Sequence, residues 1–221
     1  MPEKDSMPQV AQYWNHVSAD FDAIYTGEGK SSLARALDHW LRKDMYQRFD
    51  WVMRESGDLG GRTVCDVGCG SGRFVVEFAR RHADHVTGID VAPEMLKLAR
   101  ALTAQQGSAD RCEFVNTDVL DWTTDRVFDV TVAIGFWDYI QNPASRLAVI
   151  RRLTGRTFLS AWPRLWTWRV PLRKVRLQYV SGCPVYFYRK PHVLRLLEDA
   201  GFRVETCEAV GKLFLVKARP A

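Results

Sequence analysis

A glycine-rich turn between two contrasting stretches constrains this chain more than any other feature. Residues 64–72 read Val-Cys-Asp-Val-Gly-Cys-Gly-Ser-Gly, and an amphipathic stretch follows directly. Apolar residues, a tight turn and an amphipathic stretch predict a strand, a loop and a helix start, an arrangement that lets backbone approach a nucleotide-like ligand. A dinucleotide fingerprint would place its third glycine at position 73, where this chain has Arg73. The turn therefore predicts an α/β protein with a different kind of nucleotide site.

From this turn onward, short apolar runs alternate with helical patterns. The expected strands are Thr63–Val67, His85–Ile89, Cys112–Asn116, Phe128–Ala133, Arg156–Ala161, Arg203–Ala209 and Leu213–Ala218. The expected helices are Arg73–Arg81, Pro93–Gln105, Ala144–Leu153 and Pro191–Ala200. Such alternation predicts a parallel sheet covered by helices on both faces. Only Val210-Gly211-Lys212 joins the last two strands, which is too short for a parallel crossover and predicts an antiparallel hairpin.

The N-terminal part reads as helical. Apolar residues at helical spacing over 9–25 predict one amphipathic helix or two short ones, and a second helix is expected from Ser31 or Ser32 to about Arg54. We expect residues 1–57 to form a helical lid or cap and residues 58–221 to form the ligand-binding domain.

Composition narrows the class of protein. No apolar run is long enough to span a membrane and the first residues lack a signal-peptide core, so the expected location is cytoplasmic. The five cysteines are odd in number, and no second Cys or His pair completes a zinc site around Cys65 and Cys69. We therefore expect thiols and no metal.

The basic charge is concentrated in one aromatic-rich segment. Residues 162–190 hold seven Lys or Arg and no Asp or Glu, which leaves the remaining chain with a net charge of −2 out of a total of +5. We expect an insertion there that forms a substrate roof for an anionic or aromatic acceptor. Nucleic-acid binding is the less favoured interpretation because the rest of the chain is slightly acidic, and contact with an anionic membrane surface is a third.

The D-x-G-x-G-x-G pattern from Asp66 to Gly72, together with the expected sheet, resembles the class I S-adenosylmethionine (SAM)-dependent methyltransferases. The resemblance covers about residues 62–219. It implies a Rossmann-like, seven-stranded, mostly parallel sheet with an antiparallel terminal hairpin, helices on both faces, an N-terminal helical lid and SAM as cofactor.

The resemblance also implies which residues contact the cofactor. The turn glycines would approach the methionine moiety and ribose, Asp66 its amino group, Asp90 the ribose hydroxyls and Asp118 the adenine amino group. In the lid interpretation, Tyr13 and Tyr25 would cover the methyl group; a plain packing helix would show the same apolar stripe. The cofactor-binding set is Tyr13, Tyr25, Asp66, Gly68, Cys69, Gly70, Gly72, Asp90, Val91, Met95, Asp118, Val119 and Gly135.

The residues after the fourth strand, Phe136 to Tyr139, stand where class I enzymes face the transferred methyl group. Asp138 and Tyr139 are candidates for orienting or deprotonating the substrate, or alternatively for capping and packing, and His16 is a further candidate base. The sequence lacks the (D/N)-P-P-(Y/F) motif of adenine- and amide-directed members. The expected substrate-binding residues are Phe136, Trp137, Arg164, Trp168, Arg173 and Tyr188.

These observations predict transfer of a methyl group from SAM to an oxygen or nitrogen of a small or medium acceptor by in-line displacement. The alternatives are an RNA-directed methyltransferase and a non-catalytic SAM-binding regulator. A looser resemblance, in Ser160-Ala161-Trp162-Pro163, the basic stretch, Tyr188 and the following helix, is to magnesium-protoporphyrin O-methyltransferases.

Overall fold

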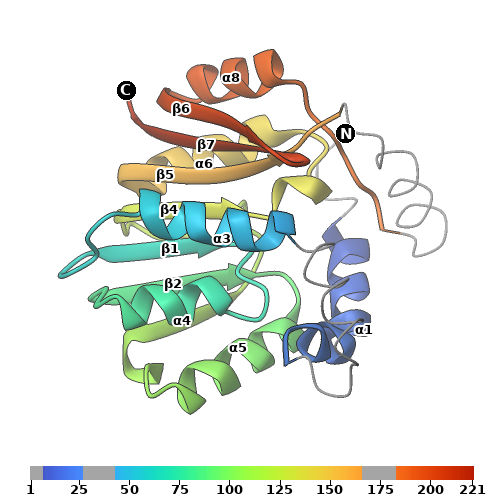
Figure 1. The fold of residues 1–221 in the computed structure, drawn as a ribbon, viewed down its shortest axis with the longest axis vertical. Coiled ribbons are helices and arrows are strands. Elements are labelled where there is room, and N and C mark those ends of the chain that lie inside the picture. Colours follow the sequence, from blue (N-terminus) through green and yellow to red (C-terminus); the bar gives the residue numbers. More distant parts are fainter. Residues whose placement is uncertain (1–6, 27–42, 166–182) are drawn as a thin grey trace.

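A seven-stranded sheet forms the centre of the molecule (Figure 1). The computed structural model describes residues 7–26, 43–165 and 183–221, and only the backbone of residues 17–26 and 43–44. The strand order is β3-β2-β1-β4-β5-β7-β6. The strands are β1 (Thr63–Val67), β2 (His85–Asp90), β3 (Cys112–Asn116), β4 (Phe128–Ile134), β5 (Thr154–Pro163), β6 (Phe202–Val210) and β7 (Leu213–Pro220).

Strand direction matches the connections that the sequence predicts. Strands β1 to β5 pair in parallel, whereas β7 runs antiparallel to both β5 and β6. The turn between β6 and β7 contains Gly211 with a φ of 53°, a left-handed conformation that glycine adopts without strain. The expected mostly parallel sheet with an antiparallel terminal hairpin is therefore confirmed.

Helices cover both faces of the sheet. They are α1 (Met7–Thr26), α3 (Lys43–Glu55), α4 (Arg73–Arg80), α5 (Pro93–Gln105), α6 (Pro143–Leu153) and α8 (Lys190–Asp199), with short 3-10 turns η2 (Ala109–Arg111) and η3 (Trp137–Tyr139). Helices α3, α4 and α5 bury side chains in a cluster on one face, and α6 and α8 do so on the other. Neighbouring residues such as Val64 and Cys65 enter different clusters because successive side chains of a strand point to opposite faces.

Two boundaries differ from expectation in a way that affects the site. Strand β5 extends to Pro163, so Trp162 is a fully buried sheet residue rather than the first residue of a basic insertion. Helix α3, which the sequence groups with the N-terminal cap, packs on the sheet with Val52 fully buried. The expected start of that helix at Ser31 or Ser32 lies outside the described residues.

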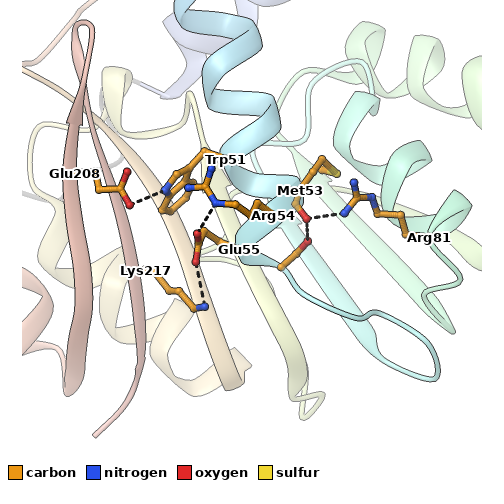
Figure 2. A network of polar contacts seen from close by, with 8 residues as sticks. Trp51, Met53, Arg54, Glu55, Arg81, Glu208 and Lys217 are labelled. Atoms are coloured by element: carbon orange, nitrogen blue, oxygen red, sulfur yellow. Dashed lines mark hydrogen bonds and ion pairs between the residues drawn. The ribbon is translucent and has the colours of Figure 1, made fainter.

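A group of polar contacts fastens α3 to its neighbours (Figure 2). Trp51 Nε1 donates a hydrogen bond to Glu208 of β6 at 3.5 Å, and Lys217 Nζ of β7 pairs with Glu55 at 3.2 Å. On the other side, Arg81 donates to the carbonyl of Met53. The helix is thus tied both to the terminal hairpin and to the end of α4.

Candidate functional site

A cavity of about 700 Å³ opens where the parallel strands end. Its walls come from the glycine turn after β1, the ends of β2 and β3, the segment after β4, and helices α1 and α3. Ligands of open α/β sheets bind at this edge, outside the carboxyl ends of the strands. The cavity therefore lies where the motif predicts a nucleotide-like ligand.

The three glycines of the turn have different surroundings. Gly68 and Gly70 line the cavity, with φ angles of 75° and 54°. Gly72 is not part of the lining: a Cβ added there would lie 2.8 Å from the Cβ of Ala99 in α5. The structure thus assigns Gly72 to close packing of the turn against α5. A Cβ at Gly68 would lie 3.0 Å from the ring of Phe136, whereas one at Gly70 would meet nothing closer than 3.9 Å, so Gly70 leaves room for a ligand.

Asp90 joins the glycine turn to the start of α5. Its Oδ2 accepts a hydrogen bond from the Gly70 amide at 2.8 Å, and its Oδ1 accepts from the Ala92 amide at 2.9 Å. Burial raises the pKa of this carboxyl, and the backbone donors partly oppose the rise. Because each carboxylate oxygen can accept a further hydrogen bond, Asp90 is also able to hold ligand hydroxyls at the cavity wall.

Asp66 lies behind the wall rather than on it. Its side chain is 1% exposed, and Oδ2 has no hydrogen-bond partner among the described residues. Burial first, and the charge of Asp90 second, raise the pKa of Asp66 to about 8, while Arg48 acts in the opposite direction. Asp66 is therefore largely protonated at neutral pH.

Arg48 of α3 is a cavity residue that the sequence does not reveal. Its side chain lines the cavity close to Gly135, and its Nε is buried without a partner in the described part of the chain. A guanidinium held there can pair with a ligand carboxylate. Only the folding of α3 against the sheet brings it next to the glycine turn.

Asp118 lines the cavity but is already paired. Its Oδ2 accepts from Arg146 of α6 at 2.6 Å, and both side chains are almost fully buried. Its Oδ1 accepts from the amide of Leu120 at 3.1 Å. Arg146 was not expected, because nothing in the periodicity of its helix marks a buried cation.

The residues after β4 separate into a cavity side and a core side. Gly135, Phe136, Asp138 and Tyr139 line the cavity, and Asp138 is 4% exposed. Trp137 does not line it: its ring is fully buried and stacks on another indole with a centroid distance of 4.2 Å. The expected substrate contact of Trp137 is thus at odds with its place in the core.

Helix α1 covers one end of the cavity. Met7, Val10 and Trp14 line it, and Trp14 meets Tyr139 edge-on at 5.8 Å. Asn15 accepts a hydrogen bond from the amide of Glu94 at 3.1 Å, which satisfies a free amide in the first turn of α5. The lid stays a prediction, and the residues that face the cavity are not Tyr13 but Met7, Val10 and Trp14.

The remaining expected residues fall into three groups. Val91, Met95, Val119 and Cys69 line the cavity as expected. Tyr13 and the exposed His16 do not line it, and Arg164 and Tyr188 line a second, smaller cavity instead. The side chain of Tyr25, and Trp168 and Arg173 altogether, lie outside the described residues.

The cysteines are thiols with no metal-ligating cluster around them in the described residues. The five cysteines are free, and burial raises the pKa of Cys69, so its thiol is neutral in the cavity wall. Within residues 7–26, 43–165 and 183–221, no cluster of three or more metal-ligating His, Cys, Asp or Glu occurs. No helix in those ranges is long and apolar enough to cross a membrane.

Part of the chain is similar to known methyltransferases. Residues 64–155 match the family model of a methyltransferase domain. Ubiquinone biosynthesis O-methyltransferase from Aeromonas salmonicida is 35% identical over 116 residues, which are 51% of this chain and 48% of that protein. The chain thus matches about half the length of such curated relatives.

Two crystal structures resemble almost the whole chain. Magnesium protoporphyrin IX methyltransferase from Synechocystis PCC 6803, with bound SAH (S-adenosylhomocysteine), superposes with a TM-score of 0.74 at 18% identity, covering 96% of this chain and 98% of that one. The [4+2]-cyclase SpnF gives a TM-score of 0.75 at 18% identity, covering 100% and 98%. At this identity the likeness establishes the fold.

Residues 64–155 therefore match a methyltransferase domain, and the strand order confirms the fold expected from the glycine turn.

Proposed function

We propose that this chain transfers the methyl group of SAM to an oxygen or nitrogen of a small or medium acceptor, anionic or aromatic in character. The observation that carries the proposal is the convergence of the glycine turn, Asp90 and Asp138 on one cavity at the strand ends. A volume of about 700 Å³ falls in the range of small-molecule sites and suits a cofactor with an acceptor beside it.

Each wall of the cavity has a role in holding the cofactor. Gly68 and Gly70 admit the methionine moiety, and Arg48 offers a partner for its carboxylate. Asp90 accepts from the ribose hydroxyls. The adenine lies between apolar side chains supplied by Val91, Met95 and Val119, with Asp118 at its polar edge.

Methyl transfer from a sulfonium is an in-line displacement. Holding nucleophile and methyl group aligned supplies much of the rate, up to roughly 7–11 kcal/mol in favourable intramolecular models. A base is required only where the nucleophile carries a proton, and Asp138 is a buried acidic residue of the cavity wall that we assign to orient or accept it. Trp14 and Tyr139 exclude water at the same end.

Oxygen is favoured over nitrogen as the acceptor atom. The relative from Aeromonas salmonicida is an O-methyltransferase, and the magnesium protoporphyrin IX methyltransferase shares the fold over nearly the whole chain. An aromatic acceptor suits a wall that contains Phe136, Tyr139 and Trp14.

A non-methylating role is the second candidate, since a [4+2]-cyclase has the same fold at equal similarity. Incubation with SAM and a panel of phenols, catechols and aromatic carboxylates, with SAH formation measured, separates the two. Formation of SAH only when an acceptor is present supports methyl transfer. Absence of turnover with every acceptor, while SAH still binds, favours the non-methylating role.

The cofactor site has its own test, calorimetric titration with SAH. We expect Asp90→Ala to weaken binding roughly tenfold to a hundredfold, because charge-assisted hydrogen bonds are worth about 1.5–3 kcal/mol each. Asp125→Ala removes an exposed carboxyl group that does not line the cavity, and this variant should bind SAH like the wild type. Normal affinity in a folded Asp90→Ala protein would show that the cofactor lies elsewhere.

A further inference from the structure

A second cavity, of about 360 Å³, lies where the chain leaves β5 and returns to α8. Two backbone hydrogen bonds close this neck: Tyr188 donates to the carbonyl of Pro163 at 2.8 Å, and Leu165 donates to the carbonyl of Tyr188 at 3.0 Å. The cavity is lined by Arg164, Leu165, Tyr188, Arg189, Lys190, Pro191 and Phe214. It therefore has a frame fixed by backbone pairing.

This cavity is separate from the proposed methyl-transfer site. Leu213 lines the large cavity, whereas its neighbour Phe214 lines the small one. Successive residues of a strand point to opposite faces, so the two cavities lie on opposite faces of β7. A ligand in the small cavity is thus separated from the large one by the terminal hairpin.

Three cations meet at the small cavity without an acidic partner. Neither Arg164, Arg189 nor Lys190 forms an ion pair with a carboxylate in the described parts of the chain. The first turn of α8, which begins beside them, contains no acidic residue and has no side-chain cap. The positive end of the helix dipole adds to the same field.

Arg164 is held in place for binding. Its Nη1 donates to the carbonyl of Gly211 at 2.8 Å, and its guanidinium lies 5.2 Å from the ring centroid of Phe214. Lys190 Nζ donates to the carbonyl of Cys207 at 3.0 Å, while Arg189 is exposed. A guanidinium fixed in this way loses little conformational freedom when it pairs with an oxyanion.

We propose that this cavity binds the phosphate group of an anionic ligand. A phosphate monoester carries a charge of about −1.5 to −2 at neutral pH and several acceptor oxygens, which matches three uncompensated cations better than a singly charged carboxylate does. Leu165, Pro191 and Phe214 provide apolar contact for the part of the ligand next to the phosphate. The inference is independent of the proposed methyl transfer.

Calorimetric titration with pyrophosphate and with inorganic phosphate at low salt tests the site. We expect the double variant Arg189→Gln/Lys190→Gln to weaken pyrophosphate binding by about tenfold or more, since charge-assisted pairs are lost. The matched control Arg152→Gln/Arg203→Gln removes the same charge from two exposed residues away from the cavity, and should bind pyrophosphate like the wild type. Acetate should bind more weakly than phosphate.

Two further measurements, of vesicle binding and of SAH affinity, separate the possible outcomes. Flotation with phosphatidylcholine vesicles, with and without phosphatidic acid, distinguishes a lipid headgroup from a soluble phosphate, and loss of either binding in the cavity variant alone supports the site. No binding of any phosphate, or equal loss in the cavity variant and in the charge-matched control, would overturn it. SAH affinity is measured in the same proteins and should be unchanged, so failure here is distinguishable from failure of the proposed function.

Discussion

Two carboxyl groups buried at adjacent strand ends have opposite environments. Asp90 receives two backbone amides, whereas one oxygen of Asp66 has no partner in the described residues. Burial raises the pKa of both, and that of Asp66 reaches about 8. Burial, reinforced by the charge of Asp90, therefore keeps Asp66 largely protonated at neutral pH.

This proton predicts a stability that depends on pH. The pKa of Asp66 in the folded state lies above its unfolded value of 3.8. The protonated carboxyl group therefore contributes its full stabilising free energy below pH 3.8, and this contribution is lost as pH rises toward 8. The free energy of unfolding of the wild type, minus that of Asp66→Asn, should decrease between these two pH values by at most about 1.4 kcal/mol per pH unit. Urea unfolding of both proteins at about pH 5 and about pH 8 measures the difference. A difference that does not change with pH would contradict the protonated state.

Gly72 offers a second test at a single residue. In Gly72→Ala the new Cβ meets Ala99 at 2.8 Å, in addition to the strain of a φ of 78°. Gly107→Ala has a similar φ, of 66°, with nothing within 4 Å, so it isolates the backbone term. We expect Gly72→Ala to lose about 1–3 kcal/mol more than Gly107→Ala in urea unfolding. The double variant Gly72→Ala/Ala99→Gly should recover much of that excess, and equal losses in the two single variants would show that the contact is unimportant.

At the scale of elements, the segment that precedes α8 makes hydrogen bonds to the 3-10 turn η3 on its core side. The hydroxyl of Tyr188 lies within hydrogen-bond distance of the carbonyls of Trp137 and Ile140, to which its single hydrogen can be donated, and the Tyr186 amide donates to the carbonyl of Asp138 at 2.8 Å. These contacts set which side of η3 faces the cavity. Tyr188 therefore acts on the large cavity from its position in the core, by fixing the backbone that carries Asp138.

Removing that hydroxyl should destabilise the protein. Tyr188→Phe leaves buried carbonyls without this donor, which costs about 1–3 kcal/mol. Tyr186→Phe is the matched control, because that hydroxyl makes only a partly exposed contact of 3.4 Å with Gln141. Urea unfolding should show a loss in the first variant and little change in the second. Equal stability of the two would mean that Tyr188 does not hold η3.

The elements were largely predictable, and the side-chain neighbours at the site were only partly so. Alternating strands, helices and the short last connection specify the sheet because their signals are local. The glycine turn and Asp90 are likewise read from spacing. Arg48 and Arg146 enter the site through packing of distant helices, which no local pattern records. Trp137 faces the core because η3 turns tightly, so that neighbours in sequence point in different directions.

At the scale of the whole molecule, α1 lies at one end of the cavity, outside the helix layers that cover the sheet. Figure 1 shows α1 beside the strand ends, next to α5. Its side chains contact three distant parts of the chain: the start of α5 through Asn15, η3 through Trp14 facing Tyr139, and the returning segment through Val10 in a cluster with Cys183 and Val185. Of the α1 side chains that the structure describes, Met7 alone belongs to the two main clusters of buried residues. Substitutions in α1 should therefore change ligand affinity without changing the free energy of unfolding much.

That separation gives the last prediction. Trp14→Ala should weaken SAH binding roughly tenfold, because it removes an apolar wall worth about 1–3 kcal/mol, while the urea midpoint changes little. Trp122→Ala is the converse control: its ring stacks on Phe128 in the core and does not line the cavity, so stability should fall with SAH affinity retained. Hydrogen exchange of the α1 amides should slow when SAH is added to the wild type and slow less in Trp14→Ala. If Trp14→Ala binds SAH as tightly as the wild type, α1 is a packing helix and not the cover of the cofactor.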